Sequence, residues 1–181
     1  MRIIAGGYKG KTLQAPAGQA TRPTADRVRQ TIFDMLLHAP WAGRDAVEGA
    51  LVLDAFAGTG ALGLEALSRG AAHATFFEND RAALAALRAN IAACGVLAHA
   101  TVCASDVLRP GPGRPQGLIF LDPPYGHGFL QLSVNVLRAE GWLSRGSLVV
   151  AEAGRLESVV EMGSILAHRV HGAAQIIVWR E

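Results

Sequence analysis

The chain has 181 residues, half of them hydrophobic, and its charges nearly cancel to a net charge of +2. Only two of the 17 basic residues are lysines, Lys9 and Lys11, so the body of the chain offers no lysine for a Schiff base or for gripping a phosphate. Residues 1–30 carry six basic residues and one acidic residue, so a head of charge +5 precedes a body of charge −3.

Length and composition are those of one compact domain that needs no metal or disulfide to fold. The two cysteines, Cys94 and Cys103, have neither zinc nor redox spacing, and we expect them to be free thiols. Charged residues interrupt the most apolar region and the N-terminus shows no secretory signal, so neither a membrane span nor export is expected. The sequence therefore predicts a monomeric, cytoplasmic protein.

The first 40 residues are expected to form an extension to the main fold. Two short extended runs, Arg2–Ala5 and Lys11–Gln14, flank a glycine-rich turn, which predicts a β-hairpin. A helix is predicted to follow, with Thr24 as its N-cap. Its apolar face consists of Val28, Ile32, Met35 and Leu36, and the residues expected to face outward are Arg27, Arg29 and Asp34.

From residue 51 onward, short apolar runs alternate with helical stretches. The predicted strands are Leu51–Leu53, Ala74–Phe77, Thr101–Cys103, Leu118–Leu121 and Ser147–Ala151, and the predicted helices are Ala61–Arg69, Arg81–Cys94 and Leu130–Glu140. Continuous apolar strands separated by helices indicate an α/β fold with a parallel sheet covered on both faces. Val159–Leu166 and Gln175–Trp179 follow with a short connection, which predicts a terminal antiparallel pair and seven strands in all.

The first of these strands leads into a glycine-rich turn, Gly58-Thr-Gly60-Ala-Leu-Gly63. This turn has the spacing of a dinucleotide-binding fold. However, Asp54 stands beside the turn, where its carboxylate suits an ammonium or sulfonium better than a pyrophosphate. No residue pair for hydride transfer follows, so a nicotinamide dehydrogenase is only a distant alternative.

Carboxylates follow three successive predicted strands, at Asp54, Glu78 and Asp106. Glu78 can accept hydrogen bonds from both hydroxyls of a ribose, and Asp106 from an adenine amino group. S-adenosylmethionine has a cationic, a ribose and an amino-donor part, so it is the predicted cofactor. The alternative roles are a helix N-cap for Asp106 and a solvated charge for Glu78. The predicted cofactor site comprises Asp54, Phe56, Gly58, Gly60, Glu78, Asn79, Ser105 and Asp106.

The strand Leu118–Leu121 ends in Asp122-Pro123-Pro124-Tyr125. Two prolines force an extended loop whose carbonyl groups cannot join a helix or a strand ladder. Together with the Asp122 carboxylate these carbonyls can accept both hydrogens of an NH₂ group, while the Tyr125 ring can stack on a base. An amine held by its hydrogens directs its lone pair at a methyl sulfonium. These four residues are the predicted catalytic residues.

The two motifs, Asp54-Ala-Phe-Ala-Gly-Thr-Gly and Asp122-Pro-Pro-Tyr, resemble those of the amino-methyltransferases of nucleic acids. Met1-Arg-Ile-Ile-Ala-Gly-Gly, Thr21-Arg-Pro-Thr24 and Ala61-Leu-Gly-Leu-Glu-Ala-Leu-Ser-Arg69 are similar to the bacterial RsmD family. The resemblance implies a Rossmann-like class I methyltransferase fold. It also implies methyl transfer from S-adenosylmethionine to guanine N2 in small-subunit (16S) ribosomal RNA, within an assembled or nearly assembled 30S particle. It places Arg22 and Thr24 beside the active site.

On this resemblance, residues 1–40 would be an RNA-contacting extension and residues 41–181 the methyltransferase domain. The predicted RNA contacts are Arg2, Tyr8, Lys9, Lys11, Arg22, Thr24 and Arg27. Two alternatives remain open, an N6-adenine methyltransferase acting on DNA or RNA and a non-catalytic RNA-binding assembly factor. Aspartate rather than asparagine at position 122 favours guanine.

Overall fold

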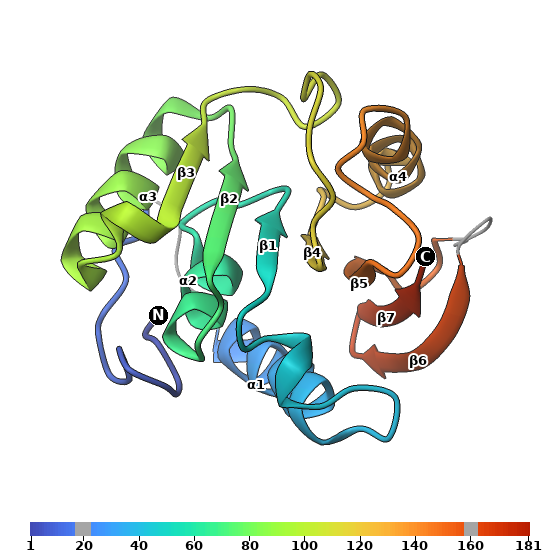
Figure 1. Cartoon of the computed structure of the whole chain (residues 1–181), viewed down its shortest axis with the longest axis horizontal. Coiled ribbons are helices and arrows are strands. Elements are labelled where there is room, and N and C mark those ends of the chain that lie inside the picture. The colour runs from blue at the N-terminus through green and yellow to red at the C-terminus, as the bar shows by residue number, and fades with distance from the viewer. Residues whose placement is uncertain (17–22, 158–162) are drawn as a thin grey trace.

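The computed structural model of the chain describes residues 1–16, 23–157 and 163–181, and it is built around one mixed sheet (Figure 1). In the described ranges the sheet has seven strands in the order β3-β2-β1-β4-β5-β7-β6. The first five along the chain pair in parallel, whereas β7 pairs antiparallel with β5 and β6. The strands are β1 Leu51–Asp54, β2 His73–Phe77, β3 Ala100–Cys103, β4 Leu118–Leu121, β5 Leu148–Gly154, β6 Ser164–His171 and β7 Ala174–Arg180. The predicted sheet is confirmed.

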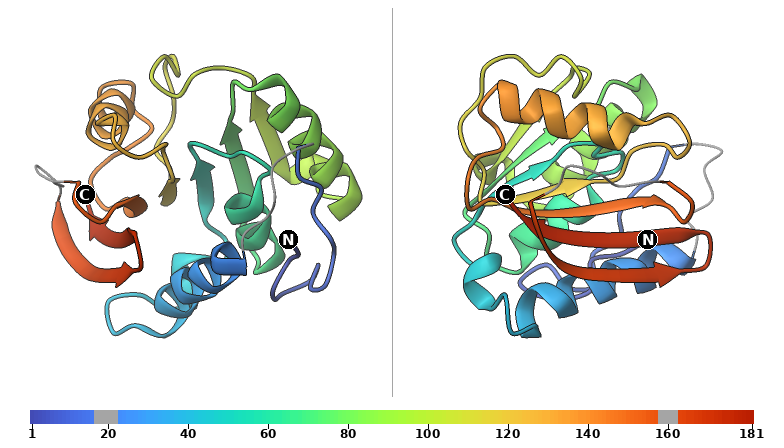
Figure 2. Two further views of the ribbon diagram at one scale, coloured as in Figure 1. Left: turned by 180° about the vertical axis from the view of Figure 1, so that it is seen from behind. Right: turned by 90° about the vertical axis from the view of Figure 1, so that its right-hand side faces the viewer.

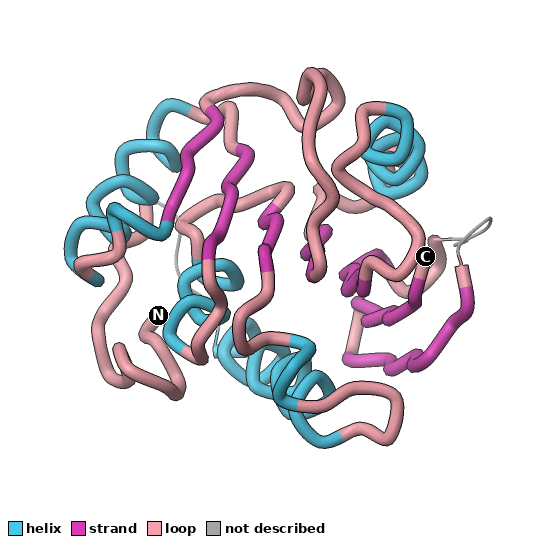
Figure 3. Tube along the Cα trace, viewed as in Figure 1, coloured by secondary structure: helices cyan, strands magenta, loops and turns pink. Residues whose placement is uncertain are grey.

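Helices cover both faces of this sheet, as the right-hand view of Figure 2 shows for α4 on one side and α1 on the other. The helices are α1 Pro23–His38, α2 Ala61–Ser68, α3 Arg81–Cys94 and α4 Phe129–Ala139. Alternate residues of β4 enter the two core layers: Phe120 belongs to the layer that contains α1, α2 and α3, and Leu121 to the layer that contains α4. Between β3 and β4 the chain forms a long loop without helix or strand (Figure 3).

The N-terminal hairpin lies on α2. Its two arms pair through a single antiparallel bridge between Arg2 and Thr12, so the predicted pairing is confirmed although neither arm forms a longer strand. The Gly7 amide donates to the Ser68 carbonyl at 2.7 Å. Gly6 has a φ of 81°, and a Cβ there would lie 1.8 Å from the same carbonyl oxygen, so only glycine fits this contact.

A buried carboxylate joins the hairpin to the helices. Glu65 of α2 is fully buried and accepts hydrogen bonds from the amides of Ile4 and Ala5 at 2.8 and 3.0 Å. The Arg69 guanidinium donates to the same carboxylate at 2.8 Å, and Arg29 of α1 lies 3.6 Å from it. These contacts fix the hairpin, α1 and α2 as one unit.

Three local predictions were wrong. Arg29 was expected to face outward, but it is 3% exposed because it faces Glu65 and donates to the Arg2 carbonyl at 2.6 Å. The helix begins at Pro23, which suits a first helical position, so Thr24 lies inside the helix and is not its N-cap. The predicted strand Val159–Leu166 begins outside the described residues, and the described strand β6 continues to His171 because its pairing with β7 sets its end.

Replacing Glu65 with alanine would leave the Arg69 guanidinium and two hairpin amides without their acceptor and would remove the anion that faces the buried Arg29 guanidinium. We expect a loss of about 3–5 kcal/mol in the free energy of unfolding, measured by urea denaturation. Glu48→Ala removes the partner from an exposed Arg44–Glu48 pair, so it should cost less than about 1 kcal/mol. Equal losses in the two variants would contradict the structural role given to Glu65.

Candidate active site

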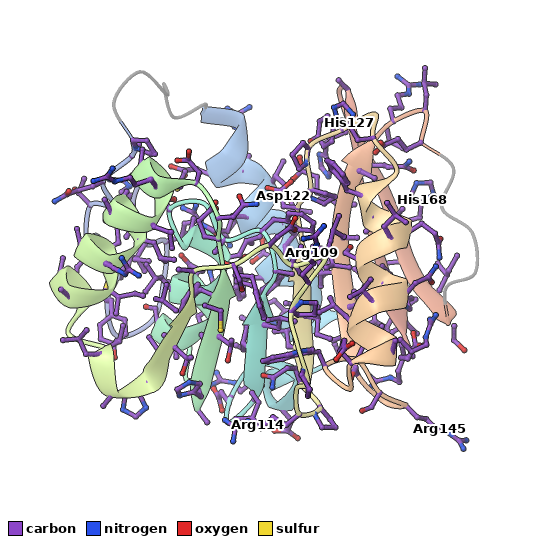
Figure 4. The ribbon with its side chains drawn as sticks, turned by 90° about the horizontal axis from the view of Figure 1, so that it is seen from above. Arg109, Arg114, Asp122, His127, Arg145 and His168 are labelled. Atoms are coloured by element: carbon purple, nitrogen blue, oxygen red, sulfur yellow. The ribbon has the colours of Figure 1, made fainter. Side chains whose placement is uncertain are left out.

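A cavity of about 300 Å³ opens at the carboxyl ends of β1 to β4. The strand order reverses between β1 and β4, and this is where open α/β sheets bind their ligands. Figure 4 shows Asp122 and His127 toward this end of the molecule and Arg114 and Arg145 at the opposite end. Eight predicted site residues line the cavity: Phe56, Gly58, Glu78, Asn79, Ser105, Asp106, Asp122 and Pro124.

Glu78 organises the rim of this cavity. Its Oε2 accepts a hydrogen bond from the Gly58 amide at 2.7 Å, and its Oε1 accepts from the amides of Asn79 and Asp80 at 2.8 and 2.7 Å. Glu78 is therefore an ordered, half-buried acceptor rather than a solvated charge. It ties the glycine-rich turn after β1 to the end of β2.

Asp54, which precedes the glycine-rich turn, and Gly60, which belongs to it, do not line the cavity. The Asp54 carboxylate is buried and accepts a hydrogen bond from the Gly63 amide at 2.9 Å, in the first turn of α2. Gly60 precedes this helix with a φ of 81°, and a Cβ there would lie 2.4 Å from the Leu87 side chain. Both residues shape the turn above which a ligand would bind.

The pKa values of two carboxyl groups at this site are raised to about 7. For Asp54 the main cause is burial, which the charge of Glu78 reinforces and the hydrogen bond from Gly63 opposes. Asp122 is an exposed residue whose carboxyl group is nevertheless closely surrounded by protein, and this desolvation, together with the charges of Glu152 and Asp54, raises its pKa. Strongly shifted carboxyl groups in and directly beside a cavity are typical of functional sites.

The loop after β4 is held against β5. The Tyr125 hydroxyl donates to Glu152, and the Gly126 amide donates to Glu157 at 2.5 Å. Pro123 is buried, whereas the Tyr125 ring is 42% exposed. Asp122 and Pro124 thus face the cavity, and Tyr125 and Pro123 do not line it.

Sequence reasoning missed the apolar part of the lining, which consists of Ala55, Phe77, Val107, Leu108 and Phe129. The only signal for these residues in the sequence was that some of them neighbour predicted site residues; Val107 and Leu108, for example, directly follow Asp106. Asp106 Oδ1 also accepts from the Leu108 amide at 2.9 Å, so the carboxylate orders the long loop after β3 instead of capping a helix.

The basic head divides into two groups of residues. Arg2, Lys9 and Arg27 line a second hollow of about 360 Å³ between the hairpin and α1. Lys11 instead donates to the Ala93 carbonyl at 2.7 Å and lies over the half-buried ring of Tyr8, so this pair anchors the hairpin to α3. Arg22 and the side chain of Thr24 lie outside the described part of the chain.

The side chains that the structure describes include no group of three or more His, Cys, Asp or Glu residues arranged to hold a metal ion. Cys94 is buried, Cys103 is half-buried, and both are free thiols as predicted. Within the described ranges, no helix is both long and apolar enough to cross a membrane.

The sheet order and the cavity at its carboxyl edge define a Rossmann-like class I S-adenosylmethionine-dependent methyltransferase fold. A solved structure described as "Putative methyltransferase yhhF from Escherichia coli" superimposes with a TM-score of 0.86 at 36% identity, covering 99% of this chain and 97% of that one. The Thermus thermophilus 16S rRNA N2 G1207 methyltransferase RsmC, solved with AdoMet and guanosine, has a TM-score of 0.71 at 21% identity over 91% of this chain and 44% of its own. The second likeness concerns the fold alone.

Sequence comparison gives the family. The family model described as "Conserved hypothetical protein 95" matches residues 1–180. "Ribosomal RNA small subunit methyltransferase D" of Escherichia coli K12 is 41% identical over 155 residues, 84% of this chain and 74% of that protein. "Putative rRNA methyltransferase YlbH" of Bacillus subtilis is 34% identical over 189 residues, covering 100% of this chain and 99% of its own. The chain belongs to the RsmD family of methyltransferases, as its motifs predicted.

Stability should depend on pH through Asp54. A buried carboxyl with a pKa near 7 binds its proton more tightly in the folded than in the unfolded state, so stability should fall as the pH rises from about 4 to about 7. Asp54→Asn keeps an oxygen for the Gly63 amide and removes the charge. Between pH 4 and pH 8 the free energy of unfolding should fall by about 2–4 kcal/mol less in this variant than in the wild type, as measured by urea denaturation.

Asp45→Asn, at an exposed position, is the matched control for this experiment. It should follow the wild-type pH profile. The same profile in Asp54→Asn would show that Asp54 does not titrate in this range.

Proposed function

We propose that the protein transfers a methyl group from S-adenosylmethionine to the exocyclic N2 of a guanine in small-subunit ribosomal RNA. The observation that carries the proposal is one shared wall: Asp122 and Pro124 line the same cavity as Glu78 and Asp106. A loop suited to an amino group therefore borders a site suited to a nucleoside-containing cofactor. The name of the Escherichia coli relative, at 41% identity, supports small-subunit ribosomal RNA as the substrate.

The residues of the cavity fit S-adenosylmethionine. Glu78 stands at the end of β2, where this type of sheet binds a ribose, and Asp106 borders the apolar side chains of Val107 and Leu108. Asp54, below the turn, has a pKa that a neighbouring cation would lower, which favours its charged form. When bound, the cofactor supplies a methyl group on a sulfonium, which is an excellent leaving group.

The protein's own residues would position the target amino group for methyl transfer. In the proposal, the Asp122 carboxylate accepts one hydrogen of the N2 amino group and the carbonyl of Pro123 accepts the other. The exposed ring of Tyr125, held by its hydroxyl, offers a face on which the base stacks. Fixing the amine in this way accelerates transfer mainly by orientation.

The target base must leave its stack to reach Asp122, which costs a few kcal/mol and favours an exposed site in RNA. We propose an assembled or nearly assembled 30S particle as the substrate, because shape and phosphate contacts then add selectivity. Arg2, Lys9 and Arg27 would supply phosphate contacts at the second hollow, and Arg22 and Thr24 are proposed contacts nearer the active site. The protein would act as a monomer in the cytoplasm.

The first test uses small ribosomal subunits from cells that lack this protein, methylated by purified enzyme with the product nucleoside identified. We expect N2-methylguanosine at one mapped position. Asp122→Ala should lower the methylation rate at saturating cofactor by more than about 100-fold, because the amine loses its acceptor. His127→Ala changes an exposed neighbour and should keep the wild-type rate.

Undiminished methylation by the Asp122→Ala variant would refute the assignment of Asp122. N6-methyladenosine as the product would favour the adenine alternative. A wild-type protein that binds the subunit without any methyl transfer would favour a non-catalytic assembly factor.

The second test concerns the basic hollow. Changing Arg2, Lys9 and Arg27 together to glutamine should weaken RNA binding and reduce the slope of log K against log salt by about two to three, since each lost phosphate contact contributes about 0.7–0.9. Arg114→Gln with Arg145→Gln is the control, because it removes two charges that do not line this hollow and that lie at the end of the molecule opposite Asp122 and His127 (Figure 4). An unchanged slope in the triple variant would exclude this hollow as an RNA contact. Cofactor affinity, measured by calorimetry, should stay the same in both.

A further inference from the structure

Two carboxylates lie side by side at the carboxyl ends of β4 and β5. The parallel register pairs Leu121 with Ala151, so the next residues, Asp122 and Glu152, are neighbours on the same side of the sheet. Asp122 stays extended because a proline follows it, and Glu152 belongs to β5. The contribution of Glu152 to the raised pKa of Asp122 is consistent with this proximity.

Within residues 1–16, 26–157 and 163–181, the pair has none of the cationic partners that adjacent carboxylates usually have. Among the described residues, no lysine, arginine or histidine forms an ion pair with Asp122 or Glu152. The Tyr125 hydroxyl donates to Glu152 Oε1 and fixes the side chain, while Oε2 accepts no hydrogen bond from the part of the chain that the structure describes. Two neighbouring anions repel each other, so a ligand that donates hydrogen bonds to both would relieve an existing cost.

The order of the strands indicates on which side of Asp122 the target base would lie. The cofactor cavity extends from Asp122 toward β1, β2 and β3, whereas Glu152 lies on the other side of Asp122. A base whose amino group is held at Asp122 and faces this cavity therefore has its ring on the β5 side, next to Glu152 and Tyr125.

We infer that Glu152 selects guanine by accepting the N1–H of the target base while Asp122 accepts from its N2 amino group. This inference rests on the proposed function. Guanine carries these two donors side by side on its Watson–Crick edge, which matches two adjacent carboxylates. In adenine and cytosine the ring nitrogen next to the amino group is an acceptor, and its lone pair faces the Glu152 carboxylate unfavourably. Glu152 is thus a specificity-determining residue at the end of β5.

The test compares guanine with 2-aminopurine at the mapped position of ligated small-subunit RNA. 2-Aminopurine keeps the 2-amino group but has a lone pair in place of the N1–H. For wild-type enzyme we expect kcat/KM to be about 100-fold higher with guanine, since with 2-aminopurine the Glu152 carboxylate faces a lone pair and gains no hydrogen bond. In Glu152→Gln the amide can still accept from Tyr125 and can donate to N1, so the ratio should fall by about tenfold or more. Loss of the O6 atom in 2-aminopurine affects both enzymes alike.

Glu157→Gln is the matched control, because the Glu157 carboxylate follows β5 but accepts from the amides of Gly126 and Gly154. This variant should keep the wild-type ratio even where its rates are lower. If the guanine to 2-aminopurine ratio is unchanged in Glu152→Gln and cofactor binding is intact, the inference about Glu152 is wrong. The proposed function still stands in that case, provided that the wild-type enzyme produces N2-methylguanosine. A wild-type product other than N2-methylguanosine would overturn both.

Discussion

The buried carboxylate of Glu65 is the constraint that holds the basic N-terminal hairpin on α2, the helix that directly follows the glycine-rich turn at the cavity. It accepts from hairpin amides and faces Arg29 of α1 and Arg69, the residue that follows α2. The Arg69 guanidinium also lies 4.6 Å from the centre of the Phe33 ring. The same helix α2 begins at the glycine-rich turn, where Asp54 binds the Gly63 amide. One short helix therefore carries the basic hairpin at its end and supports the floor of the cavity at its beginning.

The sequence could predict those features that depend on local pattern. Arg81–Cys94 and Leu118–Leu121 were predicted with their observed bounds because apolar periodicity and flanking turns define them. The ends of β5 and β6 were not predicted, since pairing with β7 extends β5 to Gly154 and sets the end of β6 at His171. The extension of β5 is what brings Glu152 to the site, and no motif contains this residue. Likewise the burial of Arg29 depends on Glu65, a partner 36 residues away in the chain.

Folding also sets an electrostatic conflict at the active-site end. Burial of Asp54 and crowding around Asp122 both favour neutral carboxyl groups, although neutral groups are weaker partners for a cation or an amine. A cationic ligand would reverse the balance by stabilising the charged forms. The small net charge thus hides two different surfaces, an acidic cavity and a basic hollow at Arg2, Lys9 and Arg27. On the proposed function the first receives a sulfonium and the second a polyanion.

The strand order separates the two recognition tasks in space. The cavity lies over β1 to β4, whereas the inferred reader of the base, Glu152, belongs to β5 on the far side of Asp122. Asp122 is then the one carboxylate common to both, because it borders the cavity and adjoins Glu152 through the β4–β5 register. In such an arrangement, substitutions at the end of β5 can change which base is accepted, while the glycine-rich turn and Glu78 continue to bind the cofactor. On the proposed roles, base specificity and cofactor binding are therefore separable in this fold, and Asp122, which would serve both, is the position least able to change.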